Sequence, residues 1–127
     1  MLRGELWCLP GGFIEYDEDY LSAGIREVRE ETSLTVEIRS ILSIVSNFLS
    51  PRLHTLVAVL EGRVVEGELG PGDDAVDARW FGHDQLPEMA FEADTHIVGR
   101  YYATGLAGLE VDPDFASPRP HRNSRIR

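Results

Sequence analysis

The clearest pattern in the chain is a helical spacing of apolar residues between positions 19 and 32. At about 100° per residue, four of them fall on one side of a helix: Leu21, Ile25, Val28 and Thr32. The acidic residues just before this segment are good N-cap candidates and favour the positive end of a helix. The pattern therefore predicts a helix over residues 19–32 with its apolar side against the core.

Shorter apolar runs elsewhere predict strands and a second helix. The strand candidates are residues 6–9, 35–45, 54–61, 64–66 and 75–81. The run 56–60 is continuously apolar, which is typical of a central strand buried on both faces. Gly62 and Arg63 are read as a hairpin turn, and residues 67–72 as a glycine-rich loop. A final helix is predicted over residues 93–104, with a buried face made of Ile97, Val98, Tyr101 and Tyr102.

The order of these elements predicts a mixed α/β (α+β) fold in which helices cover both faces of a mixed sheet. With 127 residues and no internal repeat, the chain is expected to form one domain over residues 1–116. Residues 117–127 are basic, rich in proline and without periodicity, so we expect a disordered tail there.

Composition and charge narrow the possible partners. A hydrophobic content of 43% and a charged content of 27% are ordinary for a globular protein. The net charge of −10 argues against a nucleic-acid polymer, since proteins that bind one carry basic patches. No apolar run of membrane-spanning length and no leader pattern is found, so we expect no membrane association and a cytoplasmic location.

Three glutamates on the first predicted helix need a chemical explanation. Glu27, Glu30 and Glu31 stand at i, i+3 and i+4, which places all three carboxylates on one patch of the helix. Like charges at this spacing repel each other, and folding alone gives no reason for them. Binding of Mg²⁺ or Mn²⁺ would explain the three carboxylates, because these hard cations take oxygen ligands and often bridge carboxylates to the phosphates of a substrate.

The segment that contains these glutamates resembles the Nudix box, whose pattern is G, five residues, E, seven residues, R-E-U-x-E-E-x-G-U, where U is bulky and aliphatic. The residues in register are Gly12, Glu18, Arg26, Glu27, Val28, Glu30, Glu31 and Leu34. Ser33 stands where the pattern has its final glycine. That glycine normally ends the helix in the left-handed conformation, so we expect a strained or differently shaped helix exit at Ser33.

The resemblance extends over residues 7–98. Downstream of the box it includes PRLH at 51–54, GPGDD at 70–74, RWF at 79–81 and LPEMAF at 86–91. It implies a Nudix-type α/β/α sandwich. Members of the family ordinarily have one or two strands before the segment that begins at Trp7, so we expect an N-terminally shortened fold with an open sheet edge. An open edge invites pairing with a second chain, and a homodimer is the expected assembly.

The resemblance also implies roles for the residues of the box. It gives Glu27, Glu30 and Glu31 as ligands of Mg²⁺ or Mn²⁺, adds Gly11 through its backbone carbonyl, and places Glu18 close by as a helper. Arg26 is expected to point away from the centre of the cluster and to orient a glutamate by an ion pair, as residues around metal sites commonly do.

The implied reaction is hydrolysis of a diphosphate linkage, in which a carboxylate takes a proton from water. The base could be Glu27 or Glu30 on the helix, or Asp74, which matches a distal acid found in many relatives. Phe48, Arg52 and His54 are weaker candidates for contacts with a nucleobase or ribose.

Substrate identity remains open at this level. The second half of the resemblance leans toward ADP-ribose or similar sugar nucleotides, with oxidised nucleoside triphosphates as the alternative. A different class of function is a catalytically inactive, Nudix-like nucleotide-binding or regulatory module, or a fragment that folds only as a dimer. The intact glutamates favour an enzyme, because a pure binding module has no need of a crowded anionic face.

Overall fold

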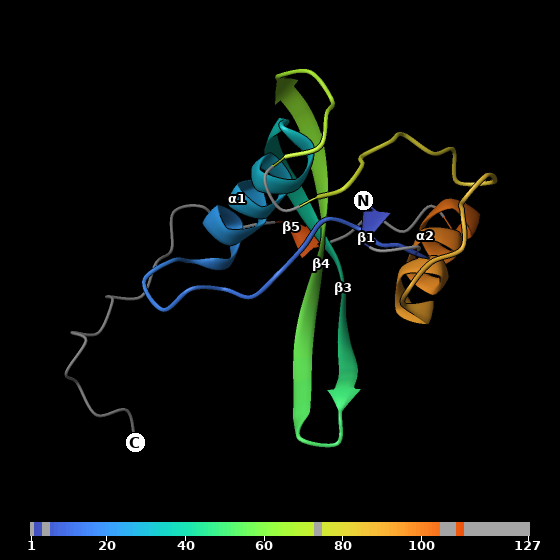
Figure 1. Ribbon diagram of the computed structural model, residues 1–127. Helices are drawn as coiled ribbons and strands as arrows, with labels where there is room; N and C mark the ends of the chain where they lie inside the picture. Colours follow the sequence, from blue (N-terminus) through green and yellow to red (C-terminus); the bar gives the residue numbers. More distant parts are fainter. Residues whose placement is uncertain (1, 4–5, 73–74, 105–108, 111–127) are drawn as a thin grey trace.

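A long antiparallel hairpin is the central element of the fold, and the two helices lie on opposite sides of it (Figure 1). The computed structural model describes residues 2–3, 6–72, 75–104 and 109–110. The elements in chain order are β1 (Leu2–Arg3), β2 (Leu6–Trp7), α1 (Tyr20–Thr32), β3 (Thr35–Ser50), β4 (Leu53–Glu66), α2 (Glu92–Thr104) and β5 (Leu109–Glu110). The predicted mixed α/β class, with a helix on each side of the sheet, is confirmed.

The strands form two small antiparallel sheets. One has the order β4-β3-β5 and the other pairs β1 with β2. The prediction of a mixed sheet is wrong, because every strand pair in the described residues is antiparallel. The parallel pairing of Trp7 with Met89 is an isolated bridge and belongs to neither sheet. That bridge, with hydrogen bonds from Trp7 N to Glu88 O and from Ala90 N to Trp7 O, ties β2 to the segment before α2.

Strand β4 departs from its prediction in two ways. It continues through Gly62 and Arg63, which pair with Ile38 and Glu37 of β3 and make no turn. The run 56–60 is also not buried on both faces, since Leu56 is 75% exposed. The reason is cover: α1 lies over Leu60, whereas Leu56 lies closer to the hairpin turn, beyond that contact.

The predicted strand over residues 75–81 is wrong. This segment is irregular apart from a bridge position at Asp77. The Asp77 carboxylate accepts hydrogen bonds from the Ala78 N–H (2.8 Å) and from Arg79 Nε (2.9 Å). Such local bonds offer the backbone an alternative to a sheet ladder. Phe81 packs edge-on against Trp7 instead, with ring centroids 4.9 Å apart.

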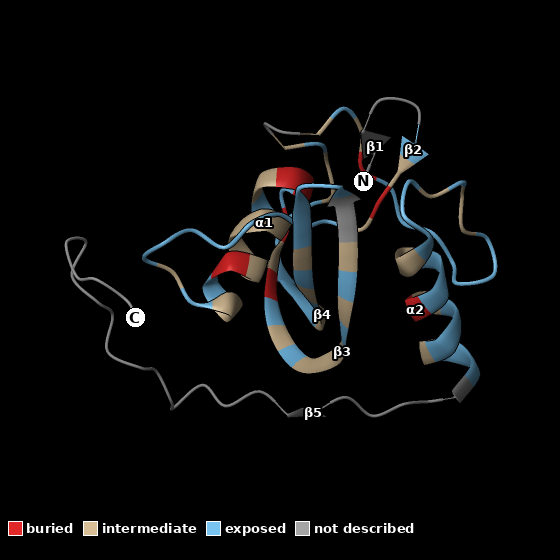
Figure 2. Cartoon of the chain, turned by 90° about the horizontal axis from the view of Figure 1, so that it is seen from below, coloured by how far each residue is buried: buried red, intermediate tan, exposed pale blue. Residues whose placement is uncertain are grey.

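Helix α1 forms as predicted, with Asp19 as its N-cap: the Asp19 carboxylate accepts from Ser22 N at 2.8 Å. Buried residues lie on α1 and the start of β3, and also just after β2 and on α2 (Figure 2). The buried apolar members of the core are Cys8, Ala23, Leu34, Val36, Ala78 and Ile97. On α2, Tyr102 is exposed rather than buried as expected, and its ring stacks on His83 with the ring centroids 4.3 Å apart.

Helix α1 ends at Ser33 in the left-handed conformation (φ 65°, ψ 9°), and the Ser33 N–H donates to Arg29 O at 3.0 Å. The expected strained exit is therefore present. The glycine-rich loop then folds back over this end of the helix. Gly70 N donates to Thr32 O (3.0 Å) and Gly72 N donates to Glu31 O (3.2 Å), which satisfies two carbonyls that a helix end leaves without partners.

The described residues bear in different ways on membrane spans and on the domain boundary. None of the helices in the described ranges has both the length and the apolar character needed to cross a membrane. The predicted boundary between residues 1–116 and the basic tail at 117–127 lies outside the described residues.

Replacing Ser33 with glycine should stabilise the protein. Glycine adopts the left-handed conformation without steric cost, so we expect Ser33→Gly to raise the free energy of unfolding by about 1 kcal/mol, measured by urea denaturation. Ser33→Ala is the matched control and should bring no gain, because it keeps a Cβ atom in the same conformation. An unchanged or lower free energy of unfolding for Ser33→Gly would contradict this explanation.

Candidate active site

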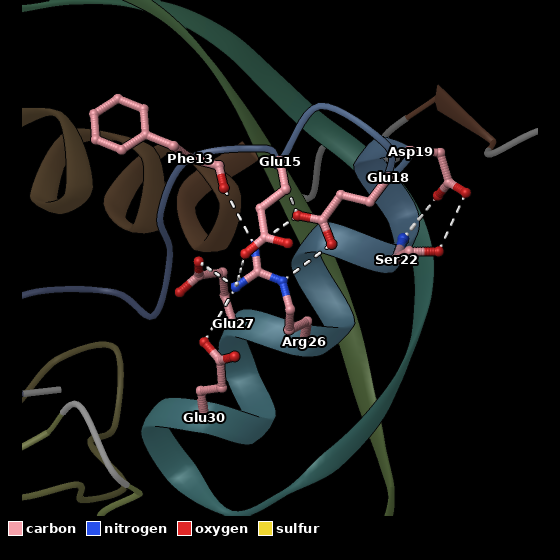
Figure 3. A network of polar contacts seen from close by, with 8 residues as sticks. All are labelled: Phe13, Glu15, Glu18, Asp19, Ser22, Arg26, Glu27 and Glu30. Atoms are coloured by element: carbon pink, nitrogen blue, oxygen red, sulfur yellow. Dashed lines mark hydrogen bonds and ion pairs between the residues drawn. The ribbon is translucent and has the colours of Figure 1, made fainter. Parts of the chain in front are cut away.

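The guanidinium of Arg26 lies at the centre of an acidic cluster formed by α1 and the loop before it (Figure 3). Its Nε and Nη2 atoms bind the two oxygens of Glu18 at 3.0 and 2.6 Å. Its Nη1 atom donates to Glu27 Oε1 at 2.9 Å and to Glu30 Oε2 at 3.1 Å. Nη2 also donates to the carbonyl of Phe13 at 3.2 Å, which fixes the loop to the helix.

Arg26 therefore points into the cluster, whereas the sequence led us to expect it to point away. The expected ion pair with a glutamate is present and is more extensive than anticipated. Placing one cation among Glu18, Glu27 and Glu30 offsets the mutual repulsion of their carboxylates.

The loop that leads into the helix packs directly on the carboxylate of Glu27. A Cβ atom added at Gly12 would lie 2.4 Å from Glu27 Oε1 and 2.8 Å from Oε2. A side chain at this position would overlap the carboxylate, so glycine allows the backbone and the acid to approach closely. This contact gives a physical reason for a glycine at position 12.

Glu31 is fully buried, with 0% of its surface exposed. Its Oε2 atom accepts a hydrogen bond from the Gly11 N–H at 2.8 Å. A buried carboxylate requires such partners, because leaving it without them would carry a large desolvation cost. The structure thus joins Gly11 to Glu31 through the Gly11 amide, while the resemblance implied a role for the Gly11 carbonyl.

Electrostatics tie Glu18 and Arg26 together. The hydrogen bonds from Arg26 lower the pKa of Glu18 to about 2, with the backbone bond at Glu15 adding to the effect. The Arg26 pKa is raised, chiefly by the same hydrogen bonds to Glu18. Both oxygens of Glu18 are used in this pair, so in this arrangement the residue supports Arg26.

The donor set suits a divalent cation. Glu27 and Glu30 direct one oxygen each to the same atom, Arg26 Nη1, and their other oxygens have no hydrogen-bond partner within the described part of the chain. No three metal-binding side chains converge on one point among the described residues. Three converging protein ligands are not required for Mg²⁺, because it is commonly held by one or two carboxylates and completes its shell with water and substrate phosphates.

Two of the remaining predicted site residues, Arg52 and His54, are not brought to this cluster. Arg52 and His54 lie at the tip of the β3–β4 hairpin, which points away from α1 (Figure 1). The prediction that they line the pocket is therefore not supported by this arrangement. The side chain of Phe48 and the whole of Asp74 lie outside the described residues.

The sequence reasoning missed the contacts made by the loops. The Phe13 carbonyl, the packing of Gly12 on Glu27, and the bonds from Gly70 and Gly72 all depend on backbone atoms. The only signal for them was the presence of glycines, which indicated loops but not what the loops contact.

Comparison with known proteins places this geometry in context. Residues 2–101 match the profile described as the NUDIX domain. Over 92 residues the chain is 40% identical to the ADP-ribose pyrophosphatase of Methanocaldococcus jannaschii, covering 72% of this chain and 54% of that protein. Over 102 residues it is 32% identical to the NAD-capped RNA hydrolase NudC of Pseudomonas aeruginosa, covering 78% of this chain and 36% of that protein. The chain thus spans about half or less of these relatives.

Two solved structures share the fold. A UDP-X diphosphatase matches with a TM-score of 0.70 and 23% identity, covering 86% of this chain and 57% of that one. A NUDIX hydrolase from Nitrosomonas europaea matches with a TM-score of 0.66 and 24% identity, covering 78% of this chain and 57% of that one. At these identities the likeness shows the architecture alone.

The lowered pKa of Glu18 predicts how the cluster responds to acid. Because the folded-state pKa lies below the ordinary value of 4.5, the stabilisation from the Glu18–Arg26 pair is fully present above pH 4.5. It is lost as the pH falls toward 2. Arg26→Gln should return the Glu18 pKa toward 4.5, measured by the ¹³C chemical shift of the Glu18 carboxyl group.

Arg63→Gln is the control for this titration, since it removes a separate exposed pair with Glu37 and should leave Glu18 unchanged. Identical Glu18 titrations in the parent and in Arg26→Gln would show that Arg26 does not cause the lowered pKa.

Proposed function

Because this chain belongs to the NUDIX domain family, we propose that it is a pyrophosphohydrolase that cleaves the diphosphate linkage of a nucleoside diphosphate derivative with Mg²⁺ or Mn²⁺. The observation that carries the proposal is the arrangement of Glu27, Glu30 and Glu31 on one end of α1, with loops from both sides holding them. A solvated helix face would need neither the buried Glu31 nor a glycine packed against the carboxylate of Glu27.

Each residue of the cluster has a distinct task in this proposal. One or two of the carboxylates of Glu27, Glu30 and Glu31 would hold the cation, with water and substrate phosphates completing its shell. Glu31 is oriented by the Gly11 N–H. Arg26 keeps Glu27 and Glu30 at a fixed separation and anchors the loop at Phe13. The chemistry supplied by a bound Mg²⁺ or Mn²⁺ is neutralisation of phosphate charge and activation of water.

Proton transfer from water needs a carboxylate that the substrate can reach. The Glu30 side chain is 40% exposed, against 14% for Glu27, and its Oε1 atom has no hydrogen-bond partner within the described residues. These features favour Glu30 as the general base on the helix. Asp74 stays a prediction for this role.

ADP-ribose or a similar sugar nucleotide is the proposed substrate class. The support comes from the similarity to a protein named as an ADP-ribose pyrophosphatase, at 40% identity. The net charge of −10 argues against a polymer such as the capped RNA named for the more distant relative. A small phosphorylated substrate remains compatible with an acidic protein, because a bound cation reverses the local field. A cytoplasmic location stays a prediction.

A substrate panel tests the proposal. Phosphate-containing products would be measured with ADP-ribose, other sugar nucleotides, NADH, dinucleoside polyphosphates, oxidised nucleoside triphosphates and NAD-capped RNA, first with Mg²⁺ and then with Mn²⁺. We expect turnover of ADP-ribose or another sugar nucleotide, and losses of about 10²-fold or more in Glu30→Gln and Glu31→Gln.

Glu37→Gln is the matched control for this panel, because it removes an exposed acid that pairs with Arg63 on the sheet. Its turnover should equal that of the parent. A folded parent that turns over nothing with either metal would refute the hydrolase and favour a nucleotide-binding module.

We also propose that the chain forms a homodimer. Strand β4 has β3 on one side and no described strand on the other, and Leu56 and Ile44 are 75% and 54% exposed on paired strands. Sedimentation velocity should give the mass of two chains, and Leu56→Lys should shift the protein toward one chain. A one-chain mass for the parent at tens of micromolar would contradict this assembly.

A further inference from the structure

The loop at residues 70–72 clamps the last turn of α1, which is the turn that carries Glu30 and Glu31. We propose that Gly72 is a positioning residue for the diphosphate reaction, through which this loop fixes both glutamates. The inference rests on the proposed function and adds to it a residue outside the Nudix-like box, one that the sequence indicated only as part of a turn.

Gly72 is in unusually close contact with the helix backbone. A Cβ atom added there would lie 1.7 Å from the Glu30 carbonyl oxygen, 2.4 Å from the Glu30 carbonyl carbon and 3.1 Å from Glu31 N. These are backbone atoms that cannot rotate aside. Any side chain at position 72 must therefore move the loop away from the helix or displace the last turn.

Conformation is not the reason for glycine at this position. Among the described glycines, the left-handed region is occupied by Gly67, at φ 98°, and not by Gly70 or Gly72. A Cβ atom on Gly70 would meet nothing within 4 Å, although Gly70 donates to the neighbouring carbonyl, Thr32 O. The two glycines thus make similar hydrogen bonds and differ in the space available to a side chain.

The clamp acts on residues that are already held from the opposite side. The Glu31 carboxylate is bound by the Gly11 N–H at 2.8 Å, and the Glu31 carbonyl is bound by the Gly72 N–H at 3.2 Å. Glu30 has its carboxylate on Arg26 and its carbonyl against Gly72. A shift of the last turn would therefore pull both carboxylates out of their shared arrangement, and a misplacement of about 1 Å can lower a rate about 10²-fold.

The same contact shapes the surface beside Glu30. A depression of about 230 Å³ opens there, lined by Arg29, Glu30, Ser33 and Gly72. Gly72 forms one wall and the end of α1 forms the other. Moving the loop would change access to the exposed carboxylate of Glu30 as well as its position.

The test compares Gly72→Ala with two alanine substitutions in the same loop. Mn²⁺ affinity is measured without substrate, by electron paramagnetic resonance, and kcat and KM are measured on the best substrate of the panel. We expect Gly72→Ala to weaken Mn²⁺ binding about tenfold and to lower kcat at least tenfold, with KM changed less than threefold. Gly70→Ala should stay within twofold of the parent in Mn²⁺ affinity, kcat and KM.

Gly67→Ala separates positioning from general destabilisation. It strains the same loop, because Gly67 is left-handed and its added Cβ would lie 2.7 Å from Ser33 O, away from the two glutamates. Samples are compared well below their melting temperatures. Loss of Mn²⁺ affinity in Gly72→Ala beyond that in Gly67→Ala supports the inference.

Two results would overturn it: parent-like Mn²⁺ affinity in folded Gly72→Ala, or equal losses in Gly67→Ala and Gly72→Ala. If the parent turns over no substrate, the hydrolase proposal fails on its own, and the Mn²⁺ comparison still decides whether Gly72 positions the site.

Discussion

The bonds of the Arg26 guanidinium to the surrounding glutamates are the interaction on which the candidate site depends. Two like-charged pairs on one helix face each cost roughly 0.2–0.5 kcal/mol, and burial of Glu31 adds a desolvation cost. Arg26 offsets the repulsion by binding Glu18, Glu27 and Glu30 at once, and its bond to the Phe13 carbonyl also fixes the loop over the helix. The Arg26 guanidinium therefore both neutralises the glutamates and holds the loop in place.

Two glycines make the second contribution, because each of them lets a backbone approach where a side chain would collide. Gly12 packs on the Glu27 carboxylate, and Gly72 packs on the Glu30 carbonyl. Gly11 contributes differently, since an added Cβ atom would meet nothing within 4 Å there and its N–H donates to buried Glu31. Loops therefore pack on both ends of the acidic face of the helix, and Gly12 and Gly72 allow this close packing because they have no Cβ atom. This explains how a helix end with little apolar core around it can still present carboxylates in a fixed arrangement.

The hairpin of β3 and β4 carries the helices but extends beyond them. Leu60 lies under Gly24 of α1, within 3.1 Å of where a Cβ would be, so this part of β4 is covered. Toward the tip, Leu56 and Ile44 are exposed, and the turn with Arg52 is far from the acidic cluster (Figure 1). In the proposed homodimer, a second subunit would cover these exposed residues of the hairpin.

The sequence by itself determined helix α1, an acidic N-cap within residues 17–19 and the shared face of the three glutamates, because these features follow from local spacing. It also anticipated the left-handed exit at Ser33, because one position in a known pattern lacked its glycine. Only the tertiary structure decided that Arg26 turns into the cluster, that β4 runs through Gly62 at a sheet edge, and that residues 75–81 form no strand. Each of these depends on partners distant in the chain, or on competition between a local side-chain bond and a sheet ladder, and neither is visible in hydrophobic periodicity.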